Sequence, residues 1–144
     1  MDTGLLHLHS ILRWVILLLL LVTFFQAIAK SNSIRSSSLL LLISAHIMFL
    51  VGAYQLIAGR FGFMKGLPEG VELMKDKTYR FFWIEHPLMM LLAIILITIA
   101  RGKAKVLNYK ATAWLLFIAL LLILAAVPWP FRDIVGRPWF PGMK

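Results

Sequence analysis

The chain has 144 residues, of which 61% are hydrophobic, with no cysteine and a formal net charge of +9. Soluble domains are about 45–50% apolar, so this composition indicates an integral membrane protein with a single domain. The absence of cysteine excludes disulfides, thiolate metal sites and cysteine nucleophiles. The positive charge suits an anionic lipid surface, and it is not combined with any recognisable nucleic-acid-binding motif.

Four apolar segments follow one another along the chain, each near the ~20 residues that cross a hydrocarbon core of ~30 Å. They cover residues 5–29, 39–58, 81–100 and 111–127. Each must be helical, because lipid cannot satisfy free backbone N–H and C=O groups. Short connections make successive helices antiparallel. We therefore expect one all-α domain over residues 1–144, an integral membrane up-down-up-down four-helix bundle.

This alternation puts both termini and the long loop 60–80 on one side of the membrane, called here the histidine side. The short basic turns 30–38 and 101–110 lie on the other side and contain no acid, whereas all six acids lie on or near the histidine side. Lys and Arg are enriched in cytoplasmic loops, and the basic turns hold six of them, although the histidine side holds eight. We expect the basic turns to be cytoplasmic and the termini to be outside, in a bacterial inner membrane.

All four histidines lie within the apolar segments, His7 and His9 in the first, His46 in the second and His86 in the third. An ionisable side chain facing hydrocarbon costs at least ~2.5–3.5 kcal/mol, so such residues usually face the bundle interior and mark function. At 1.5 Å per residue, His9 and His86 are ~6 and ~8 Å below the histidine-side boundary. His7 lies two residues from His9, on another face of the helix, and we assign it to the interface.

His9 and His86 are thus expected at nearly the same depth in the membrane, on helices that are diagonally opposite in a simple four-helix bundle. Two level, inward histidines are what a bis-imidazole haem requires. Arg13, one turn from His9, can reach back to Glu85 or to a haem propionate. The expected partner of Glu85 is Arg13, Arg80 or an arginine of the tail. His46, ~18 Å deep, is expected to be a substitute ligand, a proton relay or a helix–helix hydrogen bond. A purely structural pairing of His9 with His86 or the backbone is the alternative.

Pro87 follows His86 directly and makes the start of the third segment unusual. Proline lacks a backbone donor and disfavours helical geometry at the preceding residue. We therefore expect either a kink at His86 or an interfacial turn over 81–85, with Pro87 as the start of the membrane-spanning helix.

The tail, residues 128–144, contains four prolines, which exclude a helix through it. Its large aromatic residues suit the interfacial belt of a membrane protein: Trp129, Phe131, Trp139 and Phe140. One interpretation is a membrane-surface anchor. The other is a lid over the histidine-side end of the bundle, in which Arg132 and Arg137 bind an anionic ligand.

Three parts of the chain carry a resemblance to a known family: the stretch 6–14 (Leu-His-Leu-His-Ser-Ile-Leu-Arg-Trp), the Glu85-His86-Pro87 tripeptide and the Pro- and Trp-rich tail. The chain resembles the small bacterial four-helix membrane proteins described as cytochrome b-like. The likeness extends over the whole chain in length and helix count. A weaker likeness is to the haem-containing membrane oxidase that acts on protoporphyrinogen.

The resemblance implies haem b between the helices and a redox role. His9 and His86 would bind the haem iron, with His46 as the substitute, and electrons would pass to or from a quinone or a partner subunit. The four histidines do not form two level pairs, which argues against a two-haem wire across the membrane.

The leading prediction is a b-type cytochrome that transfers electrons, and the sequence leaves open whether it is also an enzyme in its own right. One alternative is a non-enzymatic membrane subunit or small transporter with a structural His/Arg/Glu network. A further alternative is a haem-dependent membrane oxidase. The sequence contains no Walker motif, GxGxxG or HExxH, and it leaves a homo-oligomer open.

Overall fold

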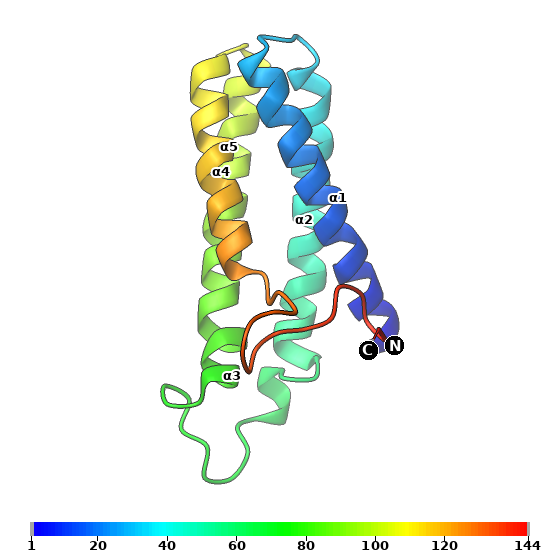
Figure 1. Ribbon diagram of the computed structural model, residues 1–144, viewed down its shortest axis with the longest axis vertical. Coiled ribbons are helices and arrows are strands. Elements are labelled where there is room, and N and C mark those ends of the chain that lie inside the picture. Colours follow the sequence, from blue (N-terminus) through cyan, green and yellow to red (C-terminus); the bar gives the residue numbers. More distant parts are fainter. Residues whose placement is uncertain (1, 144) are drawn as a thin grey trace.

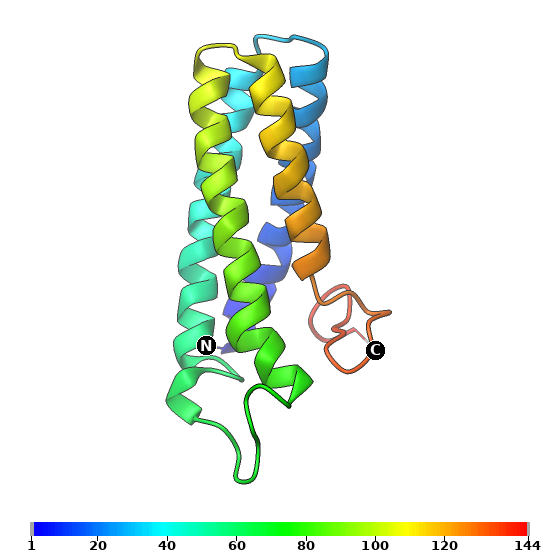
Figure 2. The same ribbon diagram turned by 90° about the vertical axis from the view of Figure 1, so that its left-hand side faces the viewer.

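The computed structural model describes residues 2–143, which form an elongated bundle of four long helices (Figures 1 and 2). The long helices are α1 (Asp2–Ile28), α2 (Ile34–Ala58), α4 (His86–Lys105) and α5 (Tyr109–Ala126). The short elements are the 3-10 turn η1 (Phe63–Lys65), the helical turn α3 (Lys77–Arg80) and the π-helical turn η2 (Phe81–Glu85). No strand occurs in this part of the chain, so the predicted all-α four-helix bundle is confirmed.

Four helices of the described chain are long and apolar enough to cross a membrane, and the protein is a multi-pass membrane protein. The closely packed neighbours are α1 with α2, α2 with α4, α4 with α5, and α5 with α1. This leaves α1 and α4 on one diagonal of the bundle. The tail and the start of α1 lie at the same end as the loop between α2 and α3 (Figure 1).

The core is built from branched aliphatic residues and from small residues that let the helices approach closely. Fully buried examples are Leu20 on α1, Leu41 on α2, Ile97 on α4 and Ala119 on α5. Most large apolar side chains on the outer faces are exposed, as contact with lipid requires. Association of helices in a bilayer depends on such close packing, because lipid is as apolar as the helix surface.

The helices extend beyond the predicted apolar segments at the basic end. α2 begins at Ile34 and not at residue 39, and α4 continues to Lys105 and not to residue 100. Two arginines join these extensions: Arg35 Nε donates to the carbonyl of Lys105 at 3.2 Å, and Arg101 Nη1 donates to the carbonyl of Arg35 at 3.1 Å. Hydropathy marks the hydrocarbon core, whereas a helix with polar partners continues into the headgroup layer.

The third membrane-spanning helix begins at Lys77, four residues before the predicted start. The Asp76 side chain caps it by accepting from the Tyr79 N–H at 2.9 Å. The helix then passes through η2, where the His86 N–H bonds the Phe81 carbonyl. Pro87 comes just after η2, inside the continuous helix, and the wider π turn interrupts the regular hydrogen-bond ladder where proline supplies no N–H. The expected irregularity is thus a wide π turn, a feature often found at functional sites.

Candidate functional site

His9 and His86 face each other across the bundle from the diagonal helices α1 and α4. Their ring centroids are 6.2 Å apart and the ring planes make an angle of 48°. Two imidazoles that share one metal through nitrogen atoms, at bond lengths of about 2.0–2.1 Å, have centroids roughly 6 Å apart. The spacing of the rings therefore matches that of two ligands on opposite sides of one metal ion.

His86 is oriented by the last carbonyl of α5. Its Nδ1 atom lies 2.8 Å from the Ala126 oxygen, and because a carbonyl oxygen can only accept, Nδ1 carries the hydrogen. Nε2 then holds the lone pair. A backbone hydrogen bond to one ring nitrogen is the usual way to fix the tautomer and orientation of a metal-binding histidine.

His9 has a nitrogen without a partner. Its Nδ1 atom is buried and makes no hydrogen bond within residues 2–143, which is costly for a buried polar atom. The ring lies beside Gly52 of α2, where an added Cβ would be 3.8 Å from His9 Cε1. The small Gly52 therefore lets α2 pass close to the His9 ring, at a distance that a Cβ would turn into ordinary van der Waals contact.

Arg13 lies one turn from His9, but it does not reach Glu85. Its Nη2 atom donates to the Trp139 carbonyl at 2.6 Å and to Ser10 Oγ at 3.4 Å. Glu85 instead pairs with Arg80, with Arg80 Nε 2.8 Å from Glu85 Oε1. Of the partners predicted for Glu85, Arg80 is therefore confirmed and Arg13 is wrong, because the cation nearer in the sequence takes the carboxylate. Arg13 Nε remains buried and unbonded within the described chain.

His46 and His7 lie apart from this pair. His46 is exposed on the outer face of α2, and its Nδ1 atom bonds the Leu42 carbonyl of the same helix at 2.8 Å. The preceding residue, Ala45, is the one that faces the core, and successive helical residues point about 100° apart. His7 is also exposed, which agrees with its assignment to the interface.

The four terminal carbonyls of α5 are all satisfied, which the sequence did not reveal. A helix leaves its last four C=O groups without intrahelical partners. Their partners here are the Val127 N–H for Ile123, Trp129 Nε1 for Leu124, Arg132 Nη1 for Ala125 and His86 Nδ1 for Ala126. Two residues of the tail and one of the two histidines therefore complete the end of α5.

The tail then crosses to α1 at the histidine-side end (Figure 1). The Trp14 ring lies 6.2 Å from Trp129, 5.9 Å from Trp139 and 6.2 Å from Phe140 between centroids. Together with the Arg13–Trp139 bond, this aromatic cluster fixes the tail against α1. Three of the four tail aromatics named from the sequence therefore pack on the bundle itself.

Arg132 and Arg137 lie over aromatic rings. Arg132 Cζ is 4.9 Å from the centroid of Phe81, and the Phe81 ring is 5.8 Å from that of His86. Arg137 Cζ is 4.9 Å from the centroid of Phe82. Burial, and secondarily the charge of Arg60, lower the pKa of Arg137. Of the predicted cofactor-binding residues, the structure brings together His9 and His86, with Arg13 one turn away, and not His46, Arg132 or Arg137.

Comparison of the chain with known protein families, curated proteins and solved structures finds no match. The chemistry of the donor set therefore decides which group fits. No cluster of three or more His, Asp or Glu side chains in residues 2–143 could hold a metal ion. Zinc in a structural site takes four protein ligands, whereas haem brings its porphyrin nitrogens and needs only axial ligands from the protein. Two facing histidines fit haem better than a bare ion.

Proposed function

We propose that the protein is a membrane b-type cytochrome that holds one haem b between His9 of α1 and His86 of α4. The observation that carries this proposal is the pair of facing imidazoles, 6.2 Å apart, at the histidine-side end of the bundle. When bound, haem b supplies one-electron transfer. A quinone or a redox partner subunit would exchange electrons with it.

The chain's own residues support this role in three ways. The Ala126 carbonyl fixes the His86 ring and leaves Nε2 available. Gly52 lets α2 pass close to the His9 ring. Arg13, whose Nε has no partner within the described residues, supplies the positive charge that a propionate requires. The surrounding apolar helices exclude water, and burial is a main influence on haem potential.

The membrane orientation is part of the same proposal. We place the protein in a bacterial inner membrane with the basic turns 30–38 and 101–110 in the cytoplasm, because these short turns hold six Lys and Arg residues and no acid, whereas the eight Lys and Arg residues of the histidine side are mixed with acids. The haem and its electron-transfer partner would then lie near the outer face.

Absorption spectroscopy tests the proposal. The full-length protein, expressed with haem available and purified in detergent, should show a Soret band and reduced α and β bands. His9→Ala and His86→Ala should each remove most of the pigment, whereas His46→Ala and His7→Ala should retain it. A protein without a Soret band, or with one that survives His9→Ala combined with His86→Ala, would overturn the proposal.

A second candidate, a non-enzymatic membrane subunit, is favoured by one specific observation. His86 also completes the end of α5, and Arg13 holds the tail, so both have structural partners. In that case the polar residues would form only a structural network. Co-purification with a larger membrane complex, without pigment, would support this candidate.

A further inference from the structure

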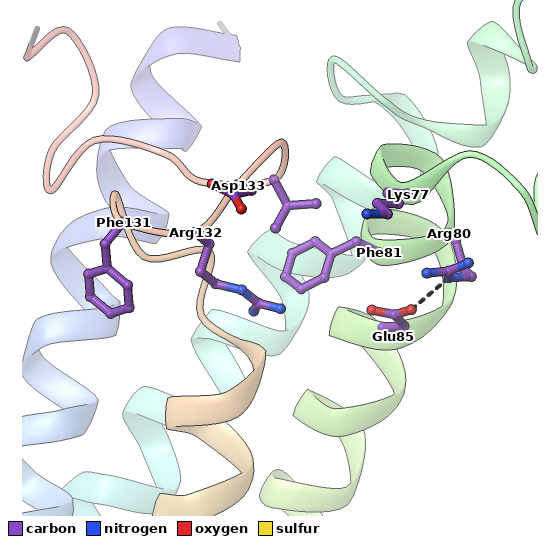
Figure 3. A pocket seen from close by; sticks show the side chains of 8 residues that line it. Lys77, Arg80, Phe81, Glu85, Phe131, Arg132 and Asp133 are labelled. Atoms are coloured by element: carbon purple, nitrogen blue, oxygen red, sulfur yellow. Dashed lines mark hydrogen bonds and ion pairs between the residues drawn. The ribbon is translucent and has the colours of Figure 1, made fainter.

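A cavity of about 360 Å³ lies at the histidine-side end, between the start of the third membrane-spanning helix and the tail (Figure 3). Its volume falls in the ~300–1,000 Å³ range of small-molecule sites. The charged side chains that line it are Lys77, Arg80, Glu85, Arg132 and Asp133. We propose that this cavity binds an anionic phosphate group, from a membrane phospholipid headgroup or from a soluble phosphate ester.

Two of the three cations of the cavity, Lys77 and Arg132, retain donors for a ligand. Arg80 is neutralised by Glu85, 2.8 Å away. Arg132 uses only Nη1 to bond the carbonyls of Ala125 and Val127, which leaves Nε and Nη2 for a ligand. Lys77 forms no ion pair within residues 2–143. Guanidinium and ammonium groups that converge on one space bind phosphate oxygens by charge-assisted hydrogen bonds.

The acids do not cancel this charge. Three cations and two acids line the cavity, which leaves one positive charge in excess. Glu85 is occupied by Arg80, and Asp133 is exposed without an ion pair in the described chain. An anionic headgroup is therefore favoured over a zwitterionic one, whose terminal cation the same side chains would repel.

The position of the cavity favours a phospholipid as the source of the phosphate. Lys77 is the first residue of the third candidate span, Lys77–Lys105, and Arg132 follows the end of α5, so both lie where headgroups meet the protein. Phe131, which also lines the cavity, and Ile134 are 75% and 61% exposed, next to Arg132. Exposed apolar groups beside a cationic cavity suit the acyl chains below a bound headgroup.

The lining of the cavity includes neither His9 nor His86, and the buried Phe81 contacts both Arg132 and His86. The proposal therefore does not depend on haem. Arg132, which the sequence assigned to a cofactor, has its guanidinium directed at Phe81 (Figure 3), on the cavity side.

Lipid titration tests the proposal on the full-length purified protein. Native mass spectrometry would count phosphatidylglycerol and phosphatidylcholine retained as each lipid is added. We expect a roughly tenfold preference for phosphatidylglycerol, consistent with the attraction of a few basic residues for anionic lipid. Lys77→Gln/Arg132→Gln should remove it. The control variant Lys65→Gln/Lys75→Gln loses the same charge on the same side of the membrane, but outside the cavity, and should keep the preference for phosphatidylglycerol.

Two further arms complete the test. Lys77→Gln alone should reduce the preference several-fold, and it removes no hydrogen bond of the fold, whereas Arg132 also supports α5. If the wild-type protein binds glycerol 3-phosphate but shows no preference between the two lipids, the phosphate group comes from a soluble ester. Equal retention of both lipids with no glycerol 3-phosphate binding, or equal loss in both double variants, would overturn the proposal.

Discussion

The two ring nitrogens of His86 have separate roles. Nδ1 donates to the Ala126 carbonyl at 2.8 Å, while Nε2 is free for a metal. Asparagine places an amide nitrogen near the position of Nδ1, but it has no counterpart of Nε2. The structural and the proposed ligand role of this residue can therefore be separated by substitution.

We predict that His86→Asn removes the pigment but leaves the unfolding temperature close to that of the wild type. His86→Ala should remove the pigment and also lower stability by about 1–3 kcal/mol, the cost of leaving a buried carbonyl unsatisfied. Thermal unfolding in detergent, compared for the two apoproteins and the wild-type apoprotein, measures the difference. Equal destabilisation by both substitutions would contradict the role given to Nδ1.

Substitutions of Gly52, which lies beside His9, test the proposed ligand role of that histidine. An added Cβ would make only ordinary contact with His9, at 3.8 Å, so Gly52→Ala should retain full pigment. Gly52→Leu should displace the His9 ring, since overpacking costs about 1–3 kcal/mol, and should reduce haem content severalfold. The ratio of haem to polypeptide is the measurement for both variants. A normal haem content in Gly52→Leu would show that a larger side chain at position 52 does not displace the His9 ring.

At the scale of single elements, the end of α5 depends on side chains from elsewhere. Trp129 Nε1 donates to the Leu124 carbonyl at 2.8 Å. Trp129→Phe keeps an aromatic ring but removes this donor, and we expect a loss of about 1 kcal/mol. Trp114→Phe is the matched control, because Trp114 is 59% exposed on α5 near the other end of the bundle. Chemical or thermal unfolding of both variants should show destabilisation only for Trp129→Phe.

The sequence was sufficient for the number and order of the long helices, because hydropathy and short turns depend on local composition. It also indicated an irregularity near His86, since Pro87 acts on its immediate neighbours. It did not indicate the π turn itself, nor the bonds from His86, Trp129 and Arg132 to α5. Those contacts join residues up to 40 positions apart, and no local pattern specifies them. For Glu85 the sequence left Arg13, Arg80 or a tail arginine open, and the local partner Arg80, five residues away, is the one found.

At the scale of the whole molecule, the two ends of the bundle differ. The basic end is closed by Arg35 and Arg101, which donate to backbone carbonyls of α4 and α2. At the histidine-side end, α5 stops at Ala126 and the tail fills the remaining space (Figure 2). The candidate haem site and the proposed phosphate cavity both lie at this second end.

The orientation can be tested directly, because the chain has no cysteine. Met64→Cys and Met143→Cys, both exposed at the histidine-side end, should react together with a membrane-impermeant maleimide added to intact cells. Ser33→Cys, in the turn between α1 and α2, should react only after the membrane is opened. The reverse pattern would invert the proposed orientation, and labelling of Met64→Cys and Met143→Cys from different sides would contradict the bundle topology.

The hydrogen bond between His86 and Ala126 also has a consequence for biosynthesis. The acceptor lies 40 residues downstream of the histidine, at the very end of the fourth membrane-spanning helix. While the ribosome is still making α5, His86 has no carbonyl to orient it, although His9 and His86 have already been translated. The His86 ring can therefore be oriented as in the folded bundle only after the last helix has been completed.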